Sequence, residues 1–132
     1  MAAGFGAEAG QALLESVVTF GLLIALSVAI INFGFIFRTL ISVTNAANVG
    51  AMVASTSTTA ANNLTAISGA ALAESDLWHC VNPAVSRALQ TDGDGNPSVS
   101  VTVSCAVVDL IAFPGVPSEV NIARTVVRRI MP

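Results

Sequence analysis

Charged side chains are scarce in this chain of 132 residues. They make up 10% of the sequence, against about 25% in an average soluble domain, while hydrophobic residues make up 54%. There is no lysine, so all five basic residues are arginines, and eight acidic residues bring the net charge to −3. A chain this apolar lies in lipid or packs heavily against partners. The lack of a basic surface argues against nucleic acid as a partner.

Side chains that could build a catalytic or metal centre are equally rare. The chain has one histidine, His79, and two cysteines, Cys80 and Cys105. The cysteine spacing matches neither a CxxC redox pair nor a zinc site. We therefore predict no enzyme, no cofactor and no metal centre. Two readings stay open for the cysteines: one disulfide in an exported head, or two buried free thiols in a cytoplasmic domain.

One acidic segment has a partial likeness to a calcium-binding loop. Residues 92–96, DGDGN, have the D-x-D-x-N opening of such a loop. The twelfth position of an EF-hand loop is a glutamate, but Val103 occupies it here, which excludes that motif. The surrounding run 91–97 is dense in residues that favour turns, so we predict a simple turn.

The strongest structural signal is an uncharged run between Glu15 and Arg38. As a helix, its 22 residues, SVVTFGLLIALSVAIINFGFIF, extend over roughly 33 Å, and the hydrocarbon core of a bilayer is about 30 Å thick. Apolar residues then recur every three or four positions, as in an amphipathic helix whose stripe narrows to alanine and glycine. We predict one helix over 11–56, with a membrane span at about 16–37. Residues 1–10 lack periodicity and are expected to be flexible.

The remaining residues, 57–132, are expected to form a small exported head. The polar stretch 55–63 is predicted to be a turn or a loosened helix end, and residues 63–74 a short helix. A further helix is predicted over 83–90, because Asn82 suits the N-cap and Pro83 the first helical position.

Two strands are predicted near the end of the chain. Strict alternation over 98–108 predicts a half-buried strand with Cys105 pointing inward. Residues 120–130 are predicted to form the second strand, after a loop at 112–119, and its Arg128 and Arg129 are expected to be solvated. The predicted fold class is therefore α+β: a long N-terminal membrane-spanning and amphipathic helix with a small antiparallel β-hairpin head.

A glycine and a glutamate mark the start of the long helix. Gly10 is followed by Gln11, and Glu15 is the fifth residue after the glycine. A carboxylate at mid-membrane costs up to roughly 2.5–3.5 kcal/mol, and less near an interface, so it needs a partner. The segment GQALLESVVTFGLLIALSVAI resembles the class III leader of type IV-like pilins. More narrowly, it resembles TadE-like minor pilins (pseudopilins) of tight-adherence systems, whose helices open G-Q-x-x-V-E-F.

The resemblance implies a processing pathway and partners. Residues 1–10 would be a leader peptide, removed by a prepilin peptidase between Gly10 and Gln11, and Glu15 would act in processing and assembly. The partners would be that peptidase, the membrane and other pilin subunits of a homo- or hetero-filament. The subunit would lie in the bacterial inner membrane as a single-pass protein and then enter an extracellular pilus or stay at the periplasmic side.

Two other interpretations stay open. The chain would be a single-pass membrane-anchored protein with a small extracytoplasmic binding domain that does not assemble, or a secretory protein with an atypical signal peptide. The apolar run is longer than the usual 7–15 residues of a signal peptide. In an exported head, a disulfide between Cys80 and Cys105 would contribute roughly 3.5 kcal/mol in the chain-entropy model.

Overall fold

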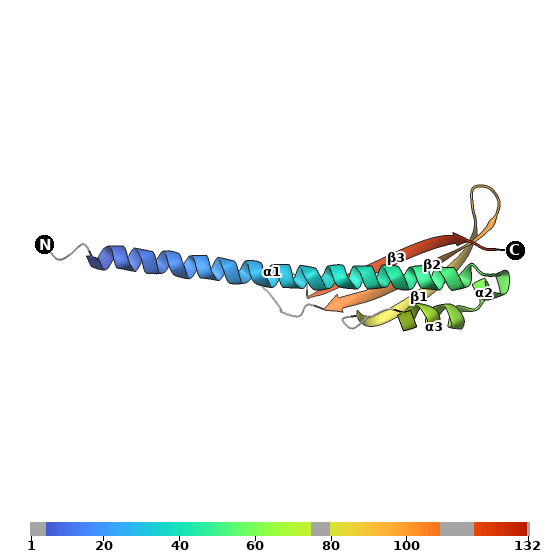
Figure 1. The fold of residues 1–132 in the computed structure, drawn as a ribbon, viewed down its shortest axis with the longest axis horizontal. Coiled ribbons are helices and arrows are strands. Elements are labelled where there is room, and N and C mark those ends of the chain that lie inside the picture. Colours follow the sequence, from blue (N-terminus) through green and yellow to red (C-terminus); the bar gives the residue numbers. More distant parts are fainter. Residues whose placement is uncertain (1–4, 75–79, 109–117, 132) are drawn as a thin grey trace. The chain divides into compact units, whose positions relative to one another are not determined.

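The computed structural model describes residues 5–74, 80–108 and 118–131. Three strands form one antiparallel sheet in the order β1-β2-β3 (Figure 1). This arrangement confirms the predicted α+β class, with a long apolar N-terminal helix and a small antiparallel sheet. Two compact units divide the chain, residues 1–34 and residues 35–132. The elements are α1 (Phe5–Ala54), α2 (Thr58–Asn62), α3 (Leu64–Glu74), β1 (Cys80–Thr91), β2 (Pro97–Val108) and β3 (Glu119–Arg129).

The first unit consists of the N-terminal part of α1. Hydroxyl side chains within this apolar helix bond to backbone carbonyls one turn earlier, because apolar neighbours offer them no other acceptor. Ser16 Oγ donates to the carbonyl oxygen of Ala12 at 2.9 Å, and Ser27 Oγ donates to that of Leu23 at 2.8 Å. These polar side chains therefore do not interrupt the helix or its apolar character.

The helix begins earlier than the sequence predicted. It starts at Phe5 rather than near Gln11, so the expected flexibility of residues 1–10 is wrong from Phe5 onward. Ala7, Glu8 and Ala9 are strong helix formers, and no proline precedes Gln11. Extending an existing helix costs far less than starting one, so the apolar segment propagates helical structure backward through these residues.

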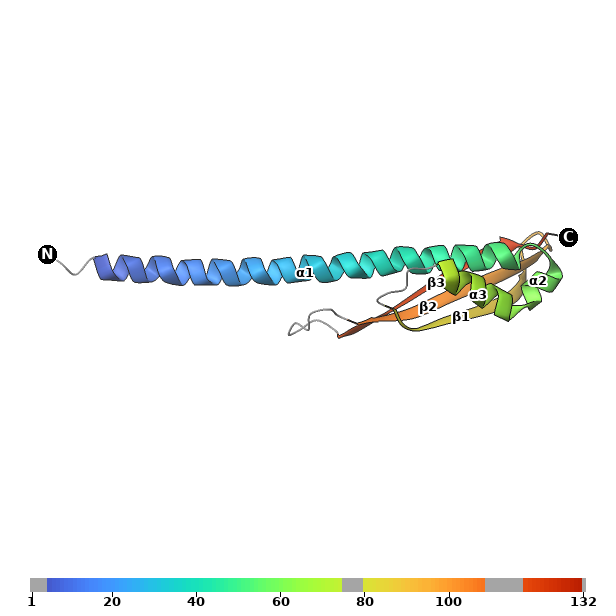
Figure 2. The same cartoon turned by 60° about the horizontal axis from the view of Figure 1, so that its bottom comes forward.

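In the second unit, one face of α1 packs on the sheet. The helix lies along the strands, and α3 lies beside it on the same face of the sheet (Figures 1 and 2). Side chains along β2 point alternately to the two faces of the sheet, so every second residue faces these helices. The predicted inward face of β2, including Cys105, is confirmed. The core consists of two clusters, one formed by Val43, Ala46, Ala47, Ala71, Val103, Cys105, Val107 and Ile122, and the other by Ala51, Ala54, Ala61, Ile67, Val99, Val101 and Ile130.

Gly50 is the point where α1 approaches both α3 and β2 closely. A Cβ built on Gly50 would lie 3.1 Å from Cγ1 of Val101 and 3.3 Å from Cβ of Ala71. It would also lie 3.5 Å from Cγ2 of Ile67. The predicted narrowing of the helix stripe to alanine and glycine is thus explained, because larger side chains would hold the three elements apart.

The segment predicted as a helix over 83–90 is part of β1, so that prediction is wrong. An eight-residue helix is marginal by itself, whereas pairing with β2 satisfies the backbone and brings Val85 opposite Val103. Asn82 does not cap a helix. It adopts a left-handed conformation with φ of 52°, and the register shifts between Val81 and Ala84. Asn82 and Pro83 therefore belong to a bulge.

The polar stretch 55–63 contains more structure than a turn. Ser57 caps α2, accepting a hydrogen bond from the backbone N–H of Ala60 at 3.1 Å. Asn63 then accepts one from the N–H of Ala66 at 3.1 Å at the start of α3. The short helix predicted over 63–74 is confirmed as α3. The loop predicted over 112–119 lies mostly outside the described residues.

Candidate functional site

The predicted cleavage position lies within α1. Gly10 and Gln11 are consecutive helical residues and both are exposed. Apart from its chain neighbours and the adjacent helix backbone, no described residue comes within 4 Å of the place where a Cβ on Gly10 would lie. The peptide bond between Gly10 and Gln11 is therefore exposed within the described residues, and cleavage there would require the helical turn to open into an extended chain. Glycine makes this opening about 1 kcal/mol easier than alanine would.

Glu15 lies on the exposed surface of α1, four residues after Gln11. Its neighbours on the helix include the exposed Leu14 and Val18. Within the described part of the chain, the Glu15 carboxylate forms no hydrogen bond or ion pair. A carboxylate set among apolar side chains needs a positive partner when lipid or other helices replace water around it.

An apolar surface surrounds the helix near Glu15. The helix is long and apolar enough to cross a membrane by length and composition, a test that a signal sequence also passes. Only 6% of its apolar window is buried within the chain, which distinguishes it from the core helix of a soluble domain. The exposed large side chains of the first unit are Leu13, Leu14, Val17, Val18, Phe20, Leu22, Leu23, Ile24, Leu26, Ile30, Ile31 and Phe33.

Cys80 and Cys105 form a disulfide, as predicted for an exported head, so the alternative of two free thiols is wrong. Their Cα atoms are 5.5 Å apart, within the usual range for a disulfide. The bond joins the first residue of β1 to the inner face of β2, close to the bulge at Asn82. Such a bond persists in oxidising compartments, which is consistent with a head outside the cytoplasm.

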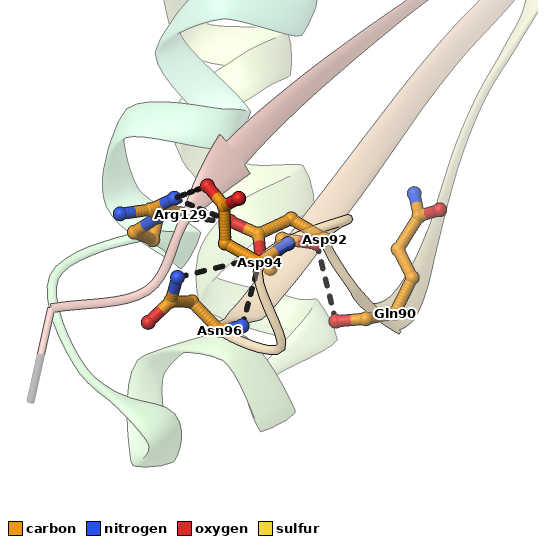
Figure 3. A network of polar contacts seen from close by, with 6 residues as sticks. Gln90, Asp92, Asp94, Asn96 and Arg129 are labelled. Carbon is orange, nitrogen blue, oxygen red and sulfur yellow. Dashed lines mark hydrogen bonds and ion pairs between the residues drawn. The ribbon is translucent and has the colours of Figure 1, made fainter.

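The turn between β1 and β2 is organised by Asp92 (Figure 3). Oδ1 of Asp92 accepts hydrogen bonds from the backbone N–H of Asn96 at 2.8 Å and of Asp94 at 3.0 Å. Gly95 has φ of 82°, which favours glycine and closes the turn. The simple turn predicted over 91–97 is therefore confirmed, and it is stabilised by a side chain within the turn.

Arg129 links this turn to the end of β3. Its Nε and Nη2 lie 2.9 and 2.6 Å from Oδ2 of Asp92, and Nη2 lies 3.2 Å from Oδ2 of Asp94. The Arg129 side chain is 57% exposed, so it is solvated as predicted, but it also forms ion pairs because the β2–β3 register places it opposite Ser98, next to the turn. Hydrogen bonds from Asn96 and the guanidinium of Arg129 lower the pKa of Asp92 below its ordinary value.

This network bears on the likeness to a calcium loop. Both carboxylate oxygens of Asp92 accept hydrogen bonds from protein donors, and a guanidinium lies where a cation would approach. In the part of the chain that the structure describes, no group of three or more histidine, cysteine, aspartate or glutamate residues is placed to hold a metal. His79 lies outside that part. The contacts of this turn therefore favour a structural role, in which the turn joins β1 to β2 and is held to the end of β3.

No protein family, curated protein or solved structure matches this chain. Two structural features outside the predicted site residues bear on its function. The first is the bridge between Arg129 and Asp92, which only strand register could reveal. The second is the outer edge of β3, which the sequence does not reveal because the order of strands in a sheet depends on pairing between distant residues.

Proposed function

We propose that this chain is a structural subunit of a type IV-like pilus, similar to the TadE-like minor pilins of tight-adherence systems. The membrane would hold it through α1 until that helix packs with the helices of other subunits into a filament. The observation that carries this proposal is the apolar part of α1 before the head, whose large side chains from Leu13 to Phe33 are exposed and which has the carboxylate of Glu15 near its start. The disulfide in the head supports export.

The exposed apolar surface restricts where α1 can reside. Each large aliphatic side chain left in water costs about 1.5–3 kcal/mol relative to burial, so the first unit needs lipid or other helices around it. Lipid and neighbouring helices are similarly apolar, and transfer between them has little hydrophobic driving force. Polar contacts and close packing must then favour the filament over the membrane. Glu15 is suited to supply such a contact.

Cleavage after Gly10 would create a positive partner for Glu15. The new N-terminal amine would be on Gln11, four residues before Glu15, or about 6 Å along the helix axis. A neighbouring parallel helix displaced by about that distance brings its amine beside the Glu15 carboxylate. At 4 Å separation and an effective dielectric of 20, such a pair attracts by about 4 kcal/mol before desolvation costs.

Intact-mass measurement of the chain from cells with and without prepilin peptidase tests the processing step. We expect the mature chain to begin at Gln11 only when the peptidase is present. Replacing Gly10 with leucine should block cleavage, because a side chain would occupy the scissile position. Gly6→Leu, the same change within the leader, serves as the matched control and should leave cleavage intact. A wild-type chain that keeps Met1 in the presence of the peptidase would refute this step.

Replacing Glu15 with glutamine tests the assembly step. The amide keeps the side chain's size but removes the charge, so we expect fewer sheared filaments with an unchanged disulfide in the head. Ser16→Ala is the matched control, since the Ser16 hydroxyl bonds only to its own helix. Filament yield is measured from sheared cells by electron microscopy. Equal yields for wild type and Glu15→Gln would exclude the proposed role of the carboxylate.

A second candidate function is a single-pass membrane protein whose head binds a partner without assembling. The observation that favours it is the strand order, which leaves β3 at an edge of the sheet. This candidate requires an uncleaved N-terminus and no sheared filaments. The same intact-mass and shearing experiments therefore distinguish the two functions.

A further inference from the structure

The two edges of the head's sheet are built differently. At the β1 edge, Pro83 and the bulge beside it interrupt the strand, features that protect edges from pairing. Arg87, also on β1, donates to the carbonyl oxygen of Asn62 at 3.3 Å. The β3 edge has neither a proline nor a bulge. Its pairing with β2 is regular along the whole strand, from Glu119 to Arg129.

Backbone groups of β3 are available along that outer edge. The N–H of Ile130 donates to the carbonyl oxygen of Pro97 at 2.9 Å, so Ile130 and Pro97 form a hydrogen-bonded pair. Hydrogen-bonded and non-hydrogen-bonded pairs alternate along antiparallel strands. The backbone N–H and C=O groups of the even-numbered residues of β3 therefore point toward β2, and those of the odd-numbered residues point away from it, toward the outer edge. Among the described residues, no strand pairs with that outer side. The residues whose backbone groups are directed outward are Glu119, Asn121, Ala123, Thr125, Val127 and Arg129.

Two arginines flank this edge on the face that carries the core. Arg124 lies opposite Val103 and Arg128 lies opposite Val99, with the half-buried Val126 between the arginines. Both arginine side chains are exposed, and within the described residues neither forms an ion pair or a side-chain hydrogen bond. A strand added to β3 would meet these even-numbered residues in non-hydrogen-bonded pairs, where opposing Cα atoms lie about 4.5 Å apart.

We propose that the outer edge of β3 binds an extended acidic segment of a partner protein as an added antiparallel strand. The segment would have the five-residue pattern acidic-x-apolar-x-acidic, where x is any residue. Its acids would face Arg128 and Arg124, and its apolar residue would face Val126. Backbone hydrogen bonds would supply affinity, and the two charge pairs would select the partner. This inference concerns the head alone and does not rest on the proposed function.

A second copy of this chain fits the edge less well. Fully overlapped antiparallel pairing of two β3 strands aligns Glu119 of each copy with Arg129 of the other, although Arg129 already binds Asp92. The same register sets the Arg124 residues of the two copies directly opposite each other. Like charges opposed across a strand pair are destabilising. Charge complementarity therefore favours an acidic partner over self-pairing.

Peptide binding to the full chain in detergent micelles tests the proposal by fluorescence anisotropy. The probe is a labelled peptide of sequence Ser-Thr-Glu-Thr-Val-Thr-Glu-Thr-Ser, and its comparison peptide has lysine in place of both glutamates. Each charge pair changes affinity by about two- to fivefold, so we expect the glutamate peptide to bind about tenfold more tightly at low salt. N-methylation of the threonines beside the valine should abolish binding, because their N–H groups face β3. N-methylation of the valine, whose N–H faces away, is the matched control.

Charge reversal in the protein completes the test. The double variant Arg124→Glu and Arg128→Glu should prefer the lysine peptide, whereas Arg87→Gln at the other edge should keep the preference for glutamate. Circular dichroism and an intact disulfide establish that each variant is folded. Equal binding of the two peptides to wild type, or no binding of either, would overturn the proposal. Sedimentation showing self-association that Ala123→Pro removes would overturn it in favour of a second copy.

Discussion

Filling the space at Gly50 tests how α1 is held to the head. Replacement by leucine would place a branched side chain where Val101, Ala71 and Ile67 already surround the backbone at 3.1–3.5 Å from a Cβ. These three residues come from β2 and α3, so no single side chain can move aside to accommodate it. Gly50→Leu should therefore separate the helix from both elements.

The size of the effect follows from two opposing contributions. Leucine favours a helix over glycine by about 0.8–1 kcal/mol, which stabilises the variant. Overpacking a well-filled core costs about 1–3 kcal/mol for modest additions, and leucine adds four carbons at a site where even one carbon requires its neighbours to shift. We expect a net loss of about 1–2 kcal/mol or more in the free energy of unfolding. Gly50→Ala should lie near neutral, because its helix gain offsets a smaller steric cost.

Gly69 provides the matched control for this experiment. It is an exposed residue of α3, and among the described residues only its chain neighbours and the adjacent helix backbone come within 4 Å of its Cβ position. Gly69→Ala should therefore show only the helix gain, a stabilisation of up to about 1 kcal/mol. Urea unfolding of the full chain in micelles, followed by the fluorescence of its single tryptophan, measures each value. A Gly50→Leu variant as stable as wild type would refute the close approach of α1, α3 and β2.

Further predictions concern the disulfide and the turn. Replacing Cys80 and Cys105 with alanine should lower the unfolding free energy by about 3.5 kcal/mol, and reductant should destabilise the wild type but not this variant. The pKa of Asp92 is lowered, so its carboxylate stabilises the fold above the ordinary value of 3.8 and this contribution is lost as pH falls through the lower folded-state pKa. The difference in Tm between wild type and Asp92→Asn should accordingly be constant above about pH 5 and shrink toward pH 2. A difference independent of pH would contradict the role of the ionised carboxylate. Arg129→Gln should lower Tm at pH 7, and it should do so less in the Asp92→Asn background, because the two side chains act as a pair.

Local sequence patterns predict the secondary structure correctly where the apolar residues of a segment follow a single helical or strand periodicity. The long helix α1 and the inward face of β2 are both predicted, because the spacing of apolar residues in each segment is unambiguous. The turn at Asp92 was predicted from its glycines and aspartates, which favour turns in almost any context. The disulfide followed from the cysteine count once an exported head was assumed.

Local patterns failed where two structures competed for the same residues. The segment after Asn82 has a plausible helix start, yet it forms β1 because β2 offers a ladder of backbone partners and an apolar face. That choice depends on partners in β2 that lie between 8 and 20 positions further along the chain, beyond the reach of a local pattern. The start of α1 was missed for a different reason: composition suggested flexibility, but helix propagation from the apolar segment extends through Ala9 to Phe5.

The sequence by itself therefore determined the parts of this protein whose chemistry is local: an apolar helix of membrane-spanning length, its carboxylate at Glu15, an alternating strand and a tight turn. Apolar spacing and turn-forming residues act over a few positions, so these features can be read without knowing the fold. Only the tertiary structure decided that residues 80–91 form the strand β1, the close approach at Gly50, the bridge from Arg129 to Asp92 and the place of β3 at an edge of the sheet. Each of these depends on which distant residues the sheet register brings together, and pairing energies over many residues set that register.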